Sequence, residues 1–560
     1  MGPRRESNGA VVLLVLALVC AALLPGTDAL PLLDRDEPRF ATATREMLEG
    51  QEWVVPTFNG APRYDKPILV YWVMRSGYWL FGVGELGARL PSLLAAAALL
   101  LMVAFGARRW VGRGPAAAAA VVLGTTLQFV IHGRLALADM LMVTCVAAAQ
   151  LALAALLLVP EPPRTRRAWL VLWSALGFGF LAKGPIALAV PALSLVLLRY
   201  VTLRVPLPWS RLRALPGFAL TGAIVAAWGV PALLATHGDF LRVGIGRHVI
   251  ERGLDGFDAR PYSPLFYLEA APLSLFPWIV LAPVVVRELR RRRDGWNAWL
   301  LAWFLAPYII FTPYRTQLPH YVLPGFPAVA LLVARGLEHE RAPRPPRRAA
   351  LVLGALACAL CALVAWVWTR PAPAELGGGG AAIIRGAAAA VALLATSAAC
   401  AAAWLSQRRV LAAGALVLFA GATEGLGRSL RACHATLAVA RALVDVPNGA
   451  RLVTVNFAEP SLVFYSHLRL EPTDSAGLAA LTADADPTSA VGGPAALVTL
   501  AREARIEGAL LGSGALTWRV PEGVEALHAH LFNAGWRASR VAGFNPGRSR
   551  WQELDVWLRR

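Results

Sequence analysis

The stretch GARLPSLLAAAALLLMVAFGARRWVGR, residues 87–113, is apolar from Leu93 to Ala107 and then ends in three arginines. A helix needs about 20 mostly apolar residues to cross a bilayer. Comparable runs recur from Val11 to Leu426, and the 560-residue chain is 57% hydrophobic and 16% charged. Because soluble proteins carry about 25% charged residues, this composition predicts a polytopic α-helical membrane protein.

The spacing of the apolar runs predicts about 13 transmembrane helices. Alternate loops are rich in arginine and poor in acids, which places the N-terminus in the cytoplasm and the C-terminus on the periplasmic side. The net charge of +19 then reflects membrane topology, not nucleic-acid binding. The first run also resembles a cleavable signal peptide, but we favour an uncleaved anchor. The expected spans lie near 9–27, 87–107, 115–132, 140–159, 168–182, 185–200, 214–235, 271–287, 296–313, 322–336, 349–368, 383–405 and 410–427.

The chain divides into a first transmembrane helix (1–29), a periplasmic loop with juxtamembrane helices (30–86), a transmembrane body (87–427) and a periplasmic α/β domain (428–560). In the last part we expect strands at Arg451–Phe457, Leu462–Tyr465 and Ala495–Leu500, and a helix at Pro521–Ala534. The run Gly377–Gly380 predicts a flexible linker. The six cysteines fall mostly in apolar spans, which indicates packing and not a disulfide framework.

Only two of the 54 basic residues are lysines, namely Lys66 and Lys183. A position that keeps an ammonium where arginine is the rule is a candidate functional position. A compact ammonium with rotatable donors suits a phosphate that is bound and then released. Chance survival under a codon bias is the alternative for either lysine.

The first exported loop carries the other candidate residues. Asp36-Glu37-Pro38-Arg39 opens a predicted amphipathic helix at the membrane surface, with the proline suited to its first turn. A second polar patch, residues 59–67, includes Asp65 and Lys66. Carboxylates can orient or deprotonate a nucleophile, and cations can stabilise a departing phosphate. Capping and interfacial charge are the structural alternative.

Several motifs resemble the polyprenyl-phosphate-sugar-dependent glycosyltransferases of the GT-C fold. The similarity is greatest to the lipid A aminoarabinose transferases and the wider protein O-mannosyltransferase-like superfamily, and it covers residues 30–335 best. Thirteen spans and a small C-terminal periplasmic α/β domain also fit that class. The matching motifs are Asp36-Glu37-Pro38-Arg39-Phe40, Arg45-Glu46-Met47, Asn59-Gly60, Asp65-Lys66-Pro67, Arg89-Leu90-Pro91-Ser92, Arg134 with Asp139, Lys183-Gly184-Pro185, His248 with Arg252, and Leu318-Pro319-His320-Tyr321.

The resemblance implies a role for each of these positions. Asp36 would be the catalytic carboxylate, supported by Glu37. The donor phosphate would be bound by a set of cations and ring side chains: Lys66, Lys183, Arg39, Arg252, Tyr321 and His320. The supporting positions would be Asp65, Arg134, Asp139 and His248, where Arg134 and Asp139 either orient loops or form a structural ion pair.

Two positions depart from the family pattern. Phe40 stands where the family usually has tyrosine, so a hydroxyl contact is lost, and Asp65 stands where relatives have glutamate. Some relatives hold a metal near the equivalents of Asp65 and His248. Two ligands are too few for a site, so we assign no metal, and a divalent ion stays open as a cofactor.

The expected activity is transfer of a sugar from a polyprenyl (undecaprenyl) phosphate to a lipid A-like or other periplasmic-face acceptor in the bacterial inner membrane. The chain shows no glycine-rich nucleotide loop, in line with a donor activated by its lipid carrier. Alternative acceptors would make it a protein O-mannosyltransferase or an O-antigen ligase. The non-enzyme alternatives are a lipid or solute transporter and a scaffold that presents the C-terminal domain.

Overall fold

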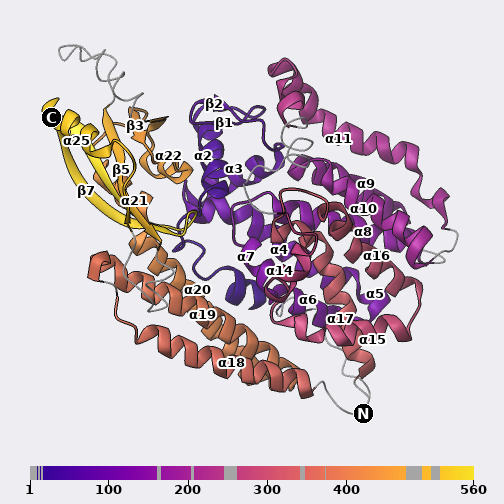
Figure 1. The fold of residues 1–560 in the computed structure, drawn as a ribbon. Coiled ribbons are helices and arrows are strands. Elements are labelled where there is room, and N and C mark those ends of the chain that lie inside the picture. Colours follow the sequence, from indigo (N-terminus) through magenta and orange to yellow (C-terminus); the bar gives the residue numbers. More distant parts are fainter. Residues whose placement is uncertain are drawn as a thin grey trace.

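The protein is seen here as a computed structural model that describes residues 9, 13, 17–159, 165–203, 207–244, 262–340, 347–372, 374–474, 495–505 and 518–559. A large helical body carries a smaller α/β domain formed by the C-terminal part of the chain (Figure 1). The expected class, an α-helical membrane protein with a C-terminal α/β domain, is confirmed at this level. All six cysteines are unpaired, as expected.

Seven helical segments in the described part of the chain are long and apolar enough to cross a membrane, or eight if one bent pair is counted. The expected number of 13 is therefore not confirmed. The seven are built on α4 (Glu85–Gly106), α8 (Asp139–Leu157), α11 (Ala214–Ala235), α17 (Phe326–Glu340), α18 (Arg347–Trp368), α19 (Gly377–Leu405) and α20 (Arg409–Cys433).

Other expected spans are broken or short. The span expected at 271–287 is two helices, α14 (Phe266–Ser274) and a segment formed by η5 (Trp278–Leu281) and α15 (Ala282–Arg291), which meet at 106°. Pro277 lies at the break and has no N–H to continue a helix. The remaining apolar helices are α6 (Arg113–Gly124), α7 (Leu127–His132), α9 (Thr165–Lys183), α10 (Ile186–Leu197) with η2 (Leu198–Thr202), and α16 (Gly295–Phe311).

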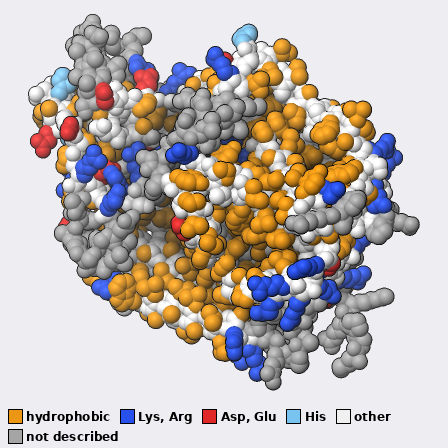
Figure 2. All heavy atoms as spheres, turned by 45° about the vertical axis from the view of Figure 1, so that its right-hand side comes forward, with side chains coloured by type: hydrophobic (Ala, Val, Ile, Leu, Met, Phe, Trp, Pro, Cys, Tyr) orange, Lys and Arg blue, Asp and Glu red, His pale blue; other side chains and the backbone are white. Residues whose placement is uncertain are grey.

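The helices differ in how much of their apolar surface other helices cover. The apolar window of α8 is 72% buried inside the molecule, whereas that of α18 is 11% buried. Figure 2 shows a broad apolar surface across the helical body. An apolar face of this extent is stable against lipid and not against water, so the chain is a multi-pass membrane protein.

The juxtamembrane segment lies between the helical body and the C-terminal domain (Figure 1). It contains α2 (Asp36–Glu49), the short strands β1 (Thr57–Phe58) and β2 (Ala61–Pro62), and α3 (Leu69–Phe81). The helix expected after Asp36 is confirmed, and its apolar residues Phe40, Ala43 and Met47 are buried. They pack in one cluster with residues of α3 and with Phe464 of the C-terminal domain, so α2 connects the two parts of the molecule.

The C-terminal domain is a mixed sheet with helices on both faces. The strand order is β4-β3-β5-β8-β7, with β6 paired to β5; β3 is parallel to β4 and β5, and the other pairs are antiparallel. Alternate strand residues face opposite sides: one face packs on α21 and α22, and the other on α25. The elements are β3 (Arg451–Val455), β4 (Arg469–Thr473), β5 (Ala496–Arg505), β6 (Trp518–Arg519), β7 (Trp536–Asn545), β8 (Arg550–Arg559), α21 (Ala435–Ala442), α22 (Pro460–Ser466) and α25 (Val524–Asn533).

Two expectations about local structure are wrong. The run Leu462–Tyr465 is not a strand but part of α22, which has Pro460 at its first position because proline is pre-organised for a helical first turn. The run Gly377–Gly380 is not a flexible linker but the first turn of α19. Gly379 packs so closely on Trp551 of β8 that a Cβ there would lie 2.2 Å from the indole Cη2 atom.

We predict that Gly379→Ala destabilises the protein by about 1–3 kcal/mol, because the methyl group overpacks the contact with Trp551. Gly378→Ala is the matched control, since a Cβ at Gly378 meets no atom within 4 Å. The measurement is thermal unfolding of both variants in detergent. Equal stability of the two variants would contradict the packing role.

Candidate functional site

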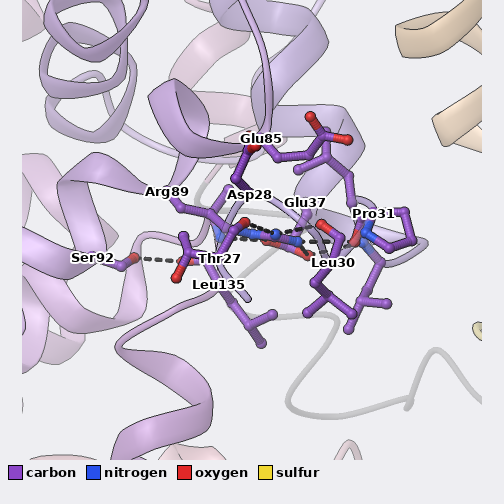
Figure 3. Close-up of polar contacts among 12 residues, drawn as sticks. Thr27, Asp28, Leu30, Pro31, Glu37, Glu85, Arg89, Ser92 and Leu135 are labelled. Carbon is purple, nitrogen blue, oxygen red and sulfur yellow. Dashed lines mark hydrogen bonds and ion pairs between the residues drawn. The ribbon is translucent and has the colours of Figure 1, made fainter. Parts of the chain in front are cut away.

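The most buried charged pair of the site region is Arg89 of α4 with Glu37 of α2 (Figure 3), whose side chains are 0% and 2% exposed. A guanidinium has five N–H donors, and Arg89 uses all five. Nε and Nη2 donate to the two Glu37 carboxylate oxygens at 2.9 Å. The other three donate to backbone carbonyls of Thr27, Leu30 and Pro31.

The carboxylate of Glu37 likewise has a hydrogen-bond donor for each of its acceptor positions. Besides Arg89, it accepts hydrogen bonds from the backbone N–H of Leu33 at 2.8 Å and of Ala136 at 2.6 Å. A carboxylate has about four acceptor positions, and all are filled. Glu37 therefore fixes the loop before α2 against the loop before α8, and the adjacent Asp36 is left exposed to solvent.

A second cluster surrounds Arg63, which is buried between α2 and α3. Its Nε donates to the Tyr71 hydroxyl at 3.0 Å, and its Nη2 lies 3.1 Å from an Asp65 oxygen. Its guanidinium carbon lies 5.1 Å from the centroid of the Phe40 ring, so the phenyl ring covers one face of the buried cation. Asp36 is within electrostatic reach of Arg63.

Lys66 is half-buried one residue beyond Asp65. Within the described residues, no group of three His, Cys, Asp or Glu side chains gathers as metal ligands. His248 and Arg252, which we expected to join this region, lie outside the described residues.

A third cluster forms around Lys183. Its ammonium pairs with Asp139, and the ring of Tyr321 lies 5.4 Å from its Nζ. The Asp139 carboxylate is also 3.6 Å from Nε2 of His320. Asp139 is the first residue of α8 and Lys183 the last of α9, which places each charge at the helix end whose dipole favours it.

Two other expectations concern this cluster. Asp139 pairs with Lys183 and not with Arg134, which donates to the carbonyl of Pro25, so the expected Arg134–Asp139 ion pair is not among the contacts of the described residues. His132, which the sequence did not single out, packs against His320, with the two ring centroids 4.6 Å apart and the rings tilted by 34°.

The three clusters share one packing environment. Phe40 of α2, Ala138 before Asp139, and Leu181 before Lys183 belong to the same buried apolar cluster. His132 is within electrostatic reach of Asp139, Lys183 and Glu37. The fold therefore gathers polar residues from four segments that lie far apart in the sequence around the start of α2.

The C-terminal domain contributes contacts that sequence reasoning missed. Arg45 donates to the carbonyls of Phe464 and Val463 near the end of α22, at 2.8 and 3.2 Å. Asn59 makes two hydrogen bonds with the backbone of Leu470, at 2.7 and 2.9 Å. Arg45 and Asn59 lie in two motifs that the sequence analysis quoted for their resemblance to GT-C enzymes, but their contacts with the C-terminal domain were not predicted.

The same domain binds the loop before Asp36. Tyr465 accepts from the Leu32 N–H at 2.8 Å and donates to Glu85 at 3.0 Å. Asp34 accepts from the backbone N–H of Ser461 at 2.9 Å and contacts its hydroxyl at 2.5 Å. Burial, and next the charge of Glu459, raise the pKa of Asp34 to about 7.

Comparison with known proteins gives partial sequence matches and a full-length structural match. The family described as dolichyl-phosphate-mannose-protein mannosyltransferase matches residues 65–228. The chain is 31% identical over 309 residues to the undecaprenyl phosphate-alpha-4-amino-4-deoxy-L-arabinose arabinosyl transferase of Edwardsiella ictaluri, covering 53% of this chain and 54% of that protein. It is 30% identical over 375 residues to the protein of the same name from Yersinia enterocolitica, covering 64% and 65%.

The crystal structure of ArnT from Cupriavidus metallidurans bound to undecaprenyl phosphate superimposes with a TM-score of 0.76 at 21% identity, covering 98% of both chains. The fold is therefore that of ArnT. The partial sequence matches point to the same class of proteins, the glycosyltransferases that use a polyprenyl-phosphate-linked sugar. The sequence matches span between about half and two thirds of the relatives' length.

We predict that Arg89→Met destabilises the protein by about 3–5 kcal/mol, because Glu37 is left buried without its counter-charge. Arg89→Lys keeps the charge but has only three N–H donors, and it should fall between wild type and Arg89→Met. The measurement is unfolding of the detergent-purified variants. An Arg89→Met variant as stable as wild type would show that the buried pair does not hold the loops.

We also predict a pH dependence from Asp34. Its pKa in the folded protein, about 7, is above the ordinary value of 3.8, so the fold favours the protonated acid. Its stabilising contribution is complete below about pH 4 and is lost as the pH rises through about 7. Asp34→Asn keeps the neutral shape, so its stability relative to wild type should increase between pH 4 and 7 and then level off. A constant difference across that range, measured by thermal unfolding, would contradict the raised pKa.

Proposed function

We propose that this protein is a membrane glycosyltransferase that moves a sugar from a polyprenyl phosphate, of the undecaprenyl type, to an acceptor at the periplasmic face of the inner membrane. The observation that carries the proposal is the Lys183 cluster within a fold shared with an undecaprenyl-phosphate-bound structure. The names of the relatives, which specify an undecaprenyl phosphate sugar and an arabinosyl transfer, support the same reaction class.

The donor phosphate would be bound by Lys183, with Lys66 and Arg39 from the juxtamembrane segment and Arg252. Lys183 is held between the Asp139 carboxylate and the Tyr321 ring. The carboxylate fixes the position of the ammonium, and the ring covers one side of it. His320 lies beside the same carboxylate. An anionic phosphate is stabilised most where it meets a fixed positive charge with few waters around it.

Asp36 would act on the acceptor. The acceptor oxygen attacks the anomeric carbon, a new carbon–oxygen bond forms, and the bond from that carbon to the phosphate oxygen breaks. The bonding electron pair leaves with the polyprenyl phosphate, which Lys183 neutralises. If the acceptor is a hydroxyl, its proton passes to Asp36 as general base; if it is already an ionised phosphate, Asp36 positions it. Glu37 supports this step by fixing the backbone next to Asp36.

The membrane orientation that fits this site has the N-terminus in the cytoplasm and the C-terminal domain in the periplasm. The juxtamembrane segment and the C-terminal domain pack together, so they must lie on the same side of the membrane. A lipid A-like acceptor and a protein acceptor both fit this arrangement. A transporter fits less well, because Asp36 and Lys66 lie outside the helices that could cross the membrane.

We predict that Asp36→Asn lowers kcat about 10²–10⁴-fold, as expected for loss of a general base, and that Lys183→Ala loses transfer through weaker donor binding. The assay is sugar transfer in membranes from a radiolabelled polyprenyl-phosphate sugar pool. Asp28→Asn is a matched control, because Asp28 is an exposed carboxylate in the same loop. Full transfer by Asp36→Asn and Lys183→Ala at wild-type protein levels would refute the proposed site.

A further inference from the structure

A cavity of about 490 Å³ lies in the C-terminal domain, next to the loop that carries Asp36. Asn456, which lines it, directly follows β3, and Leu500 and Glu503 line it from the middle and the second half of β5. The cavity therefore lies at the carboxyl ends of two neighbouring parallel strands. β3 lies between β4 and β5 in the sheet. The next strand in the sequence, β4, is therefore on one side of β3, and the strand after that, β5, is on the other. In open α/β sheets, ligands bind at such a switch point.

The cavity is strongly basic. Four arginines and one glutamate are among the residues that line it: Arg35, Arg519, Arg548, Arg550 and Glu503. Two of the arginines are paired, Arg548 with Glu459 at 2.5 Å and Arg550 with Glu503. The guanidinium groups of Arg35 and Arg519 make no hydrogen bond or ion pair with any described residue, and both side chains are exposed.

This charge pattern selects the ligand chemistry. The two paired arginines are held in place by buried carboxylates, and the two others supply uncompensated positive charge. The guanidinium group of arginine binds a phosphate through two parallel N–H donors, because the spacing of two phosphate oxygens matches the spacing of the two donors. The volume lies within the range of sites for small molecules and is larger than one phosphate needs.

The position of Arg35 connects the cavity to the proposed reaction. Arg35 is bonded directly to Asp36, and consecutive Cα atoms are about 3.8 Å apart. Across the cavity, Arg548 and Arg519 come from the C-terminal domain. A ligand held from both sides would therefore lie near the start of α2, where Asp36 stands.

We infer that this cavity binds a phosphate group of the acceptor substrate and so positions the acceptor beside Asp36. The assignment to the acceptor rests on the proposed function, whereas the phosphate site rests on the cavity and its arginines alone. The C-terminal domain would then determine which acceptors are used, and a phosphate-bearing acceptor would be preferred to one without phosphate.

Binding is tested first, on the full chain in detergent, with inorganic pyrophosphate as the probe in isothermal titration calorimetry at low salt. Loss of one charged hydrogen-bond donor should raise the Kd at least about tenfold in Arg519→Gln and in Arg35→Gln. Arg537→Gln is the matched control, because Arg537 is an exposed arginine of the same domain that does not line the cavity. Equal pyrophosphate binding by wild type, Arg519→Gln and Arg35→Gln would overturn the phosphate site.

A competition experiment identifies the source of the phosphate. Micelles that contain phosphatidic acid should displace pyrophosphate from the wild type if lipid-borne phosphate reaches the cavity. Neutral micelles should not displace it. Displacement by phosphatidic acid supports a lipid acceptor, and its failure while pyrophosphate still binds assigns the cavity to water-soluble phosphate compounds.

Kinetics separate the acceptor role from the proposed function. In the transfer assay, Arg519→Gln should raise the KM for a phosphorylated acceptor about tenfold while kcat and the donor KM stay near wild type. Unchanged acceptor KM in an active Arg519→Gln enzyme would refute the acceptor role and leave the glycosyltransferase intact. Pyrophosphate binding without transfer by any wild-type preparation would instead refute the proposed function and leave the phosphate site intact.

Discussion

The buried Arg89–Glu37 pair is the interaction on which the arrangement of the site depends. A buried ion pair is costly unless every donor and acceptor is satisfied, and here five donors of Arg89 and the acceptor positions of Glu37 all have partners. The partners come from α2, α4, the loop before α2 and the loop before α8. Because these segments converge on one pair, the start of α2, which presents Asp36, has a defined place relative to the helical body.

The C-terminal domain gives the same loop its second set of contacts. Ser461 and Tyr465 of α22 bind the backbone and side chains before α2, and Arg45 and Asn59 bind back to the domain. The loop is therefore held on one side by the helical body and on the other by the α/β domain. The C-terminal domain therefore contacts the loop that precedes Asp36 directly. It does not merely cover the helical body from outside.

The two lysines illustrate how composition and geometry complement each other. Their rarity in an arginine-rich chain marked Lys66 and Lys183 as candidates without any structural knowledge. The structure adds that Lys183 is held by Asp139 at the facing ends of two helices, next to His320 and Tyr321. Four residues that are close in space thus come from three separate segments, and no local pattern in the sequence could show that Asp139 pairs with Lys183 and not with the nearby Arg134.

The sequence by itself determined the membrane class, most helix positions, the helix that begins at Asp36 and the presence of an α/β domain, because apolar length and periodicity are local properties of the chain. The tertiary structure decided the rest. It broke the expected span near Pro277 into two bent helices, made Leu462–Tyr465 a helix, and packed Gly379 against Trp551. It also assigned Glu37 to Arg89 and brought Arg35 to the basic cavity of the C-terminal domain. These are contacts between residues up to several hundred positions apart, whose energies depend on packing and charge pairing in three dimensions and not on neighbouring residues.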